Sequence, residues 1–182
     1  MTENFNLDKL RFPIGSFKCP ESVEAAQMSL WISEIESFPA SINNLTKHLS
    51  AAELNWKYRP GGWSIKQVVH HCADSHMNCL IRFKLALTEE TPTIKPYEES
   101  KWAELKDALT DDISASLQIT EGIHSRWSVL LKNMSKEQFS MQYFHPESQK
   151  TFALDEITGF YAWHCNHHLA HIRQALSHKN QF

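Results

Sequence analysis

Hydrophobic residues recur every three or four positions along most of this chain, which is the spacing of an amphipathic helix. The pattern predicts helices over residues 22–48, with an interruption at Pro39, and over residues 64–88, 111–133 and 155–178. Few runs of β-branched residues occur, so the pattern favours an all-α protein. Four long helices of this kind predict a four-helix bundle.

Capping residues indicate where the predicted helices begin. Ser64 and Gln67 have the spacing of a capping box, in which two residues three positions apart satisfy each other's backbone N–H groups. Asp155 is the expected N-cap of the last helix, and a further capped turn is expected near Ser50. The Pro-Gly-Gly sequence at residues 60–62 separates the first two helices.

The connecting segments complete the expected architecture. Residues 1–21 are expected to form an extended, loop-like N-terminal segment. The longest connection starts at residues 89–101 and is expected to cross over between the second and third helices. Two short aromatic and β-branched runs within residues 140–153 are compatible with a small β-hairpin before the last helix. We expect residues 1–182 to form a single domain, since this length is sufficient for one core.

Composition and charge exclude several classes of protein. The chain is 42% hydrophobic with a net charge of −3, so it should fold and offers no basic surface for nucleic acid. No segment reaches the roughly 20 apolar residues of a membrane-spanning helix, and the N-terminus lacks the apolar core of a signal peptide. The four cysteines form no C-x-x-C pair. Reduced thiols in a cytoplasmic protein are the simple interpretation.

Histidines gather in two of the predicted helices. Seven of the eleven lie in two clusters: His70, His71 and His76, then His164, His167, His168 and His171. His164 and His168 are four residues apart, so both imidazoles project from one helical face and can bind one ion. The same face is otherwise apolar, which suggests that it points into the core. Two histidines there are either metal ligands or hydrogen-bonded core residues, unless the helix turns them to solvent.

A third histidine would complete a common type of metal site. Three neutral imidazoles with a fourth, open position are typical of catalytic zinc. The pattern alone leaves the third residue undecided. His76 lies on the apolar stripe of residues 64–88, whereas His71 lies on a mixed face with more pocket-like neighbours such as Ser75 and Asn78.

Several longer motifs stand in a fixed order along the chain: Pro60-Gly-Gly-Trp63-Ser-Ile-Lys-Gln-Val-Val-His70-His71-Cys-Ala-Asp74, Arg82-Phe-Lys-Leu-Ala-Leu-Thr88, Pro92-Thr-Ile-Lys-Pro-Tyr97, His145-Pro-Glu147, and Tyr161-Ala-Trp-His164-Cys-Asn-His167-His168-Leu-Ala-His171-Ile172. Together they resemble the YfiT branch of the DinB/YfiT superfamily, and the resemblance extends from about Leu10 to the C-terminus. It implies a four-helix bundle with a divalent metal on three histidines. One follows the Pro-Gly-Gly-Trp motif by eight residues, and two have H-x-x-x-H spacing in the last helix. In this sequence these are His71, His164 and His168.

The resemblance also implies a function. YfiT-like members are described as metal-dependent hydrolases, so we expect metal-bound water to attack a small-molecule substrate. Other members resemble bacillithiol S-transferases, in which the metal activates the thiolate of a low-molecular-weight thiol. A non-catalytic, stress-related metal-binding bundle is the third possibility. One Zn²⁺ or Ni²⁺ per subunit is expected, since imidazole suits both ions. Family members are dimeric, which implies a homodimer.

Two further residues are candidates for roles beside the metal. Asp74 lies one turn after His71 and is a candidate base or hydrogen-bond partner of a ligand, although a solvated carboxylate is the simpler interpretation. Arg82 lies on the same side of the helix. It could bind an anionic group of the substrate, although a surface salt bridge explains it equally well.

Overall fold

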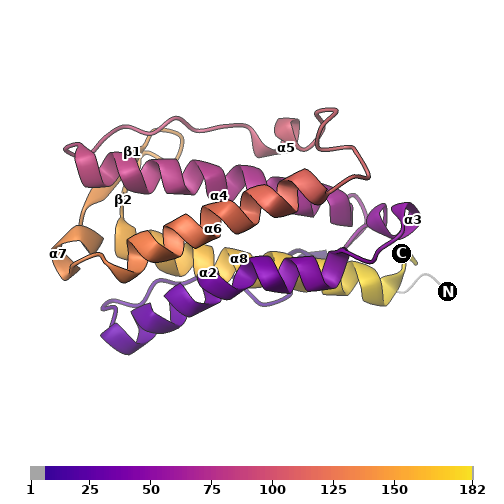
Figure 1. Cartoon of the computed structure of the whole chain (residues 1–182), viewed down its shortest axis with the longest axis horizontal. Coiled ribbons are helices and arrows are strands. Elements are labelled where there is room, and N and C mark those ends of the chain that lie inside the picture. The colour runs from indigo at the N-terminus through magenta and orange to yellow at the C-terminus, as the bar shows by residue number, and fades with distance from the viewer. Residues whose placement is uncertain (1–6, 182) are drawn as a thin grey trace.

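Four long helices form the body of the protein in this computed structural model, which describes residues 7–181. They are α2 (Ala25–Thr46), α4 (Ile65–Thr88), α6 (Ser114–Lys132) and α8 (Leu154–His178). α2 and α8 run in one direction, and α4 and α6 run in the opposite one (Figure 1). α2 packs against α6 and α8, and α4 packs against the same two helices. The four helices therefore enclose one interior, as the predicted four-helix bundle requires.

The connections explain this order of helices. A short helix, α3 (Ala51–Leu54), lies between α2 and α4. The connection from α4 to α6 returns along the bundle past α5 (Glu99–Trp102), so that α4 and α6 run parallel (Figure 1). This is the predicted long crossover. Between α6 and α8 lie α7 (Lys136–Phe139) and an antiparallel hairpin of β1 (Gln142–His145) and β2 (Lys150–Ala153), which confirms the expected hairpin.

The hairpin also holds the crossover in place. The backbone N–H of Ile94 donates to the carbonyl of Phe144 at 3.0 Å, and the N–H of Phe144 donates to the carbonyl of Pro92 at 2.9 Å. On the other face of β1, the Tyr143 side chain is buried in the core. The crossover is therefore fixed to the end of the bundle at which α4 ends.

α2 continues through Pro39, so the predicted interruption there is wrong. Proline has no N–H, and the carbonyl of Ile35, four residues earlier, loses its helical donor. Nδ1 of His124 on α6 lies 2.6 Å from this carbonyl oxygen and donates to it instead. Because a side chain from another helix satisfies the freed carbonyl, the helix can remain continuous.

The starts of two helices and the N-terminal segment can also be compared with their predictions from the sequence. The capping box of Ser64 and Gln67 is present as predicted. Asp155 does not cap α8, because the N-cap is Ala153 and the Asp155 carboxylate accepts from the N–H of Glu156 within the first turn. In the segment predicted to be loop-like, Leu7–Arg11 form a short helix, α1, and residues 1–6 lie outside the described residues.

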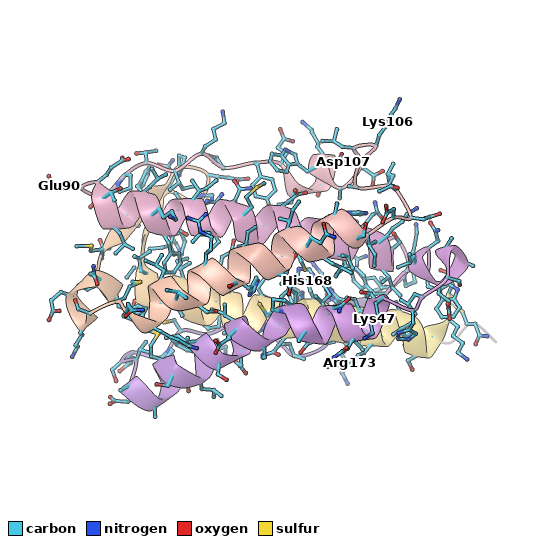
Figure 2. All side chains as sticks on the ribbon, in the orientation of Figure 1. Lys47, Glu90, Lys106, Asp107, His168 and Arg173 are labelled. Atoms are coloured by element: carbon cyan, nitrogen blue, oxygen red, sulfur yellow. The ribbon has the colours of Figure 1, made fainter. Side chains whose placement is uncertain are left out.

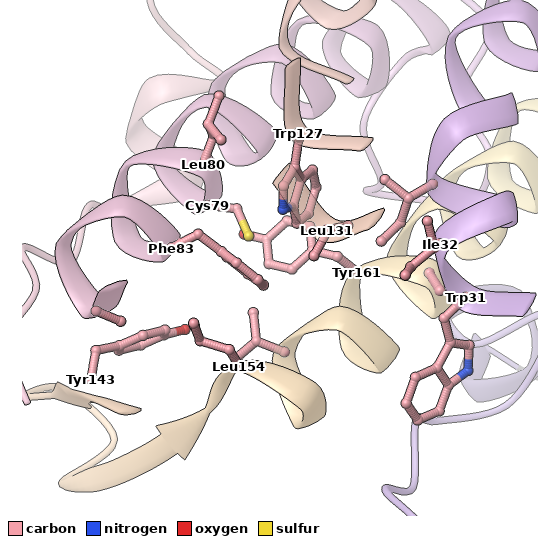
Figure 3. Packing of buried hydrophobic residues seen from close by; sticks show 14 of the residues in the cluster. Trp31, Ile32, Cys79, Leu80, Phe83, Trp127, Leu131, Tyr143, Leu154 and Tyr161 are labelled. Carbon is pink, nitrogen blue, oxygen red and sulfur yellow. The ribbon is translucent and has the colours of Figure 1, made fainter. Parts of the chain in front are cut away.

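The core consists of two clusters of buried apolar residues along the bundle. The hairpin-end cluster contains Trp31, Phe83, Trp127, Leu154 and Tyr161 among others (Figure 3). The α3-end cluster contains Phe38, Ile42, Leu54, Val69 and Ile172 among others. The ring of His76 contacts Phe38 of one cluster and Trp127 of the other. Buried histidines therefore lie where the two clusters meet. Within residues 7–181, no helix is long and apolar enough to cross a membrane.

Candidate metal centre

Three histidine side chains from two helices meet inside the bundle. We call His71 of α4 and His164 and His168 of α8 the histidine triad. The Nε2 atoms of His71 and His164 lie 3.3 Å apart, and those of His164 and His168 lie 3.2 Å apart. α4 and α8 pack against each other, and His168 lies about midway along the bundle (Figure 2). The structure thus brings together three residues from distant parts of the sequence.

The triad has the spacing that a tetrahedral metal ion needs. With metal–nitrogen bonds of about 2.0–2.1 Å, two imidazole nitrogens on a tetrahedral ion lie roughly 3.3–3.4 Å apart. Two of the Nε2 separations in the triad, 3.3 and 3.2 Å, are close to this value. Three nitrogen donors from neutral side chains also match the chemistry of a zinc or nickel ligand set. The residues therefore fit a divalent ion.

Burial keeps these imidazoles in the form that binds metal. Desolvation, followed by the nearby His167, lowers the pKa of His71 to about 4. Desolvation is also the main cause that holds the pKa values of His164 and His168 well below the usual range. All three rings are therefore neutral near pH 7, and each has one nitrogen lone pair available.

The triad lies at the boundary between core and surface. His71, His164 and His168 retain exposed fractions of 5%, 7% and 6%, whereas His76 is completely buried. The half-buried Trp63 packs against the His71 ring with a centroid separation of 4.7 Å. Each residue of the triad is therefore buried but keeps a small exposed area, and the ring of Trp63 lies beside that of His71.

The N-terminal segment packs along α8 next to the triad. The carbonyl of Arg11 accepts from Nε2 of His171 at 3.1 Å, and the carbonyl of Gly15 accepts from the indole N–H of Trp163 at 3.0 Å. His171 is buried and stacks on Tyr58 with a ring separation of 3.8 Å. His171 is therefore a core histidine.

Asp74 and Arg82 are not bonded to the triad. Asp74 is half-buried, and burial, with a smaller effect from the charge of Asp107, raises its pKa to about 6. Arg82 lines a polar cavity of about 440 Å³ together with Tyr97 and His145, and it donates to a carbonyl of the crossover. Within residues 7–181, no hydrogen bond or ion pair joins either side chain to the triad.

Two buried histidines lie behind the triad. Nε2 of His76 is 3.1 Å from Nδ1 of His164, so His76 approaches the triad from inside instead of taking the place of His71. Nδ1 of His76 is 2.7 Å from Nε2 of His124. His124 was not among the residues predicted from the sequence. The signal was available, since a buried stripe on α6 contains it: Ser116, Thr120, His124, Trp127 and Leu131.

Comparisons with known proteins identify the family of this chain. Residues 34–172 match the family model of the DinB superfamily. The chain is 45% identical over 165 residues to the Bacillus subtilis protein named "Putative metal-dependent hydrolase YfiT", covering 91% of this chain and 93% of that protein. It is 43% identical over 176 residues to a Bacillus pumilus protein named "Putative metal-dependent hydrolase", covering 97% and 99% of the two chains.

A solved structure gives the same result. YfiT from Bacillus subtilis, described as "a probable metal-dependent hydrolase with an unusual four-helix bundle topology", superposes with a TM-score of 0.91. The two chains are 43% identical, and the match covers 94% of this chain and 98% of that one. This chain therefore belongs to the DinB superfamily, and it is similar to YfiT over most of its length.

Proposed function

We propose that this chain is a metal-dependent hydrolase of a small-molecule substrate, in which His71, His164 and His168 bind one Zn²⁺ or Ni²⁺ per subunit. The separation of the three Nε2 atoms, 3.3 and 3.2 Å between neighbours, is the observation that carries this proposal. The names of the relatives support hydrolysis over other reactions. From the family resemblance we also expect a cytoplasmic homodimer.

The residues of the chain supply orientation and shielding. When bound, a divalent ion supplies Lewis acidity, which polarises a carbonyl group and lowers the pKa of a nearby water or thiol. The three imidazoles are neutral, so they leave the positive charge of the ion undiminished. Trp63 and Phe160 pack against His71 and His164, and this aromatic wall reduces the local dielectric.

Asp74 is the proposed proton acceptor. Its pKa of about 6 suits a group that takes up and releases protons near neutral pH. The charge of Asp107 contributes to raising the pKa of Asp74, and the charge of Asp74 contributes to raising the pKa of Tyr97. A substrate that extends from the triad to the Asp74 carboxylate would contact both.

Arg82 is the proposed contact for an anionic part of the substrate. Its guanidinium group lines the cavity of about 440 Å³ with Tyr97 and the hairpin residue His145. A guanidinium group binds carboxylate or phosphate oxygens through paired hydrogen bonds. The cavity also contains Glu99 and Glu147, so an anionic substrate group would compete with them for Arg82.

The metal content of untagged protein tests the proposal. We expect one Zn²⁺ or Ni²⁺ per chain in the wild type, and a loss of at least tenfold in occupancy for His71→Ala or His168→Ala. His48→Ala is the matched control, because His48 is exposed and should leave the content unchanged. Equal metal content in all four proteins would contradict the proposed ligands.

Activity assays then separate the reactions. Metal-loaded protein is incubated with chromogenic esters and with a chromogenic aryl halide, each with and without bacillithiol. Hydrolysis that does not depend on the thiol supports the proposed function. Turnover only in the presence of the thiol would replace it with thiol S-transfer, and metal binding without any turnover would favour the non-catalytic bundle.

A further inference from the structure

A chain of hydrogen bonds runs from the backbone of α2 to the histidine triad. Nδ1 of His124 lies 2.6 Å from the carbonyl oxygen of Ile35, and Nε2 of His124 lies 2.7 Å from Nδ1 of His76. Nε2 of His76 lies 3.1 Å from Nδ1 of His164. His76 and His124 have exposed fractions of 0% and 1%, so water does not compete for these contacts.

The bond between His124 and the carbonyl of Ile35 determines the position of every proton in this series of hydrogen bonds. A carbonyl oxygen can only accept, so the proton of His124 is on Nδ1. A neutral imidazole has one N–H, and Nε2 of His124 must therefore accept from Nδ1–H of His76. By the same step, Nε2 of His76 accepts from Nδ1–H of His164. This leaves the lone pair of His164 on Nε2, the atom that faces His71 and His168.

Two further observations support this assignment. Burial lowers the pKa of His124 to about 4, so its ring is neutral, and His76 is completely buried beside the rings of Phe38 and Trp127. Pro39 explains why the carbonyl of Ile35 is available, since a residue with an N–H at position 39 would occupy it within the helix.

The same group of side chains does not resemble a second metal site. His76, His124 and the thiol of Cys165 lie close enough together to be considered as ligands. However, the nitrogen atoms of His76 and His124 are 2.7 Å apart, which is a hydrogen-bond distance and shorter than the roughly 3.3 Å between ligands of a tetrahedral ion. Burial among apolar residues also holds the pKa of the Cys165 thiol well above its usual range, so the thiol stays protonated.

We propose that Pro39, His124 and His76 act as positioning residues that fix the tautomer and ring orientation of His164, so that its Nε2 lone pair faces the metal position. This inference rests on the proposed metal-binding function. It assigns His164 a different role from His168, whose Nδ1 is buried without a hydrogen-bond partner among the described residues. His164 is thus the ligand that the interior of the protein holds in place.

Nitrogen NMR of histidine-labelled, metal-free protein tests the tautomers directly. We expect the signals of His124, His76 and His164 to show the proton on Nδ1. In His76→Leu, which removes the acceptor of the His164 proton, the His164 signal should become that of a mixture of tautomers. A wild-type signal with the proton of His164 on Nε2 would overturn the proposal, whatever the protein does with metal.

Zinc affinity, measured by competition with a chelator, gives the second readout. His76→Leu should weaken binding by about 10- to 100-fold, the usual effect of losing a hydrogen-bond partner of a metal ligand. His76→Gln should bind within about threefold of wild type, because its amide can accept from His164 and donate to His124. A His76→Leu protein that binds zinc as tightly as wild type would overturn the proposal.

Phe38→Leu is the matched structural control. Phe38 packs on the same His76 ring, with centroids 5.1 Å apart, and forms no hydrogen bond with it. We expect this variant to lose thermal stability while its zinc affinity stays near that of wild type. An equal loss of affinity in Phe38→Leu and His76→Leu would reduce the role of His76 to packing. If the wild-type protein binds neither zinc nor nickel, the proposed function fails. The NMR measurement then still decides which nitrogen of each histidine carries the proton.

Discussion

His124 donates the hydrogen bond that Pro39 removes from α2. Its Nδ1 atom is 2.6 Å from the carbonyl oxygen of Ile35, the group that a residue with an N–H at position 39 would bind. This bond connects α6 to α2 in the middle of the bundle. It also gives the buried His124 a defined tautomer, and His76 is bound at the other nitrogen of the ring.

The coupling between these two residues is measurable as a difference in stability. His124→Leu should destabilise the protein by roughly 2–4 kcal/mol, because it leaves a buried carbonyl without a donor and disturbs the packing of the core. In a Pro39→Ala background the cost should be about 1 kcal/mol smaller, since the substitution restores a backbone N–H that can bind the carbonyl of Ile35. Urea unfolding of the four proteins gives the coupling energy. Equal costs in both backgrounds would show that the bond contributes nothing.

Two helical glycines are expected to respond to alanine in opposite directions. A Cβ atom on Gly159 of α8 would lie 2.7 Å from the ring of Trp31, so Gly159→Ala should destabilise the fold by about 1–3 kcal/mol. A Cβ on Gly122 of α6 would meet no atom within 4 Å. Gly122→Ala should therefore stabilise the helix by up to about 1 kcal/mol. Thermal unfolding of both variants tests this contrast. An unchanged melting temperature for Gly159→Ala would mean that the contact between α2 and α8 is loose enough to accept the added Cβ atom.

Acid should destabilise the metal-free protein through His124. Burial lowers its pKa from the usual 6.5 to about 4 in the folded protein. Below pH 6.5 the unfolded chain takes up a proton at this position and the folded protein does not, so stability falls as the pH falls towards 4. The slope from this residue is at most about 1.4 kcal/mol per pH unit. The difference in unfolding free energy between pH 7 and pH 5 should be smaller in His124→Gln than in the wild type. An equal difference in the two proteins would show that His124 does not cause the acid sensitivity.

If Asp74 is the proton acceptor, activity should rise with pH as its carboxyl group loses its proton. The pKa of about 6 places this rise between about pH 5 and 7. Asp74→Asn should remove the rise together with most of the turnover. Asp107→Asn is the sharper test, because the charge of Asp107 contributes to raising the Asp74 pKa. This variant should shift the rise to lower pH, and a profile that stays in place would exclude Asp74 from the reaction.

Much of the fold follows from local signals in the sequence. The periodic spacing of apolar residues located four long helices, and the Ser64 capping box marked the start of α4. Local signals failed where a distant residue decides the structure. Pro39 predicts a break, and only His124, 89 residues away from the carbonyl that it satisfies, allows α2 to continue. Asp155 was a plausible cap, but the chain enters α8 directly from β2.

Part of the candidate site could also be predicted from local signals in the sequence. The spacing of His164 and His168 indicates a shared face, since both residues lie on one helix. Periodicity could not choose between His71 and His76, because both are buried on α4 and differ only in the side from which they meet α8. The motif that resembles YfiT favoured His71. The stripe on α6 contains His124, but the sequence alone assigns it no role, because that role depends on α6 packing against α2.

The most direct test of the account is a crystal structure of zinc-loaded protein with data collected on both sides of the zinc absorption edge. We predict one strong anomalous peak per chain, about 2.0–2.1 Å from Nε2 of each of His71, His164 and His168, with the fourth position accessible to solvent. A peak bound by fewer than two of these nitrogens, or zinc found only at surface histidines, would contradict the central claim.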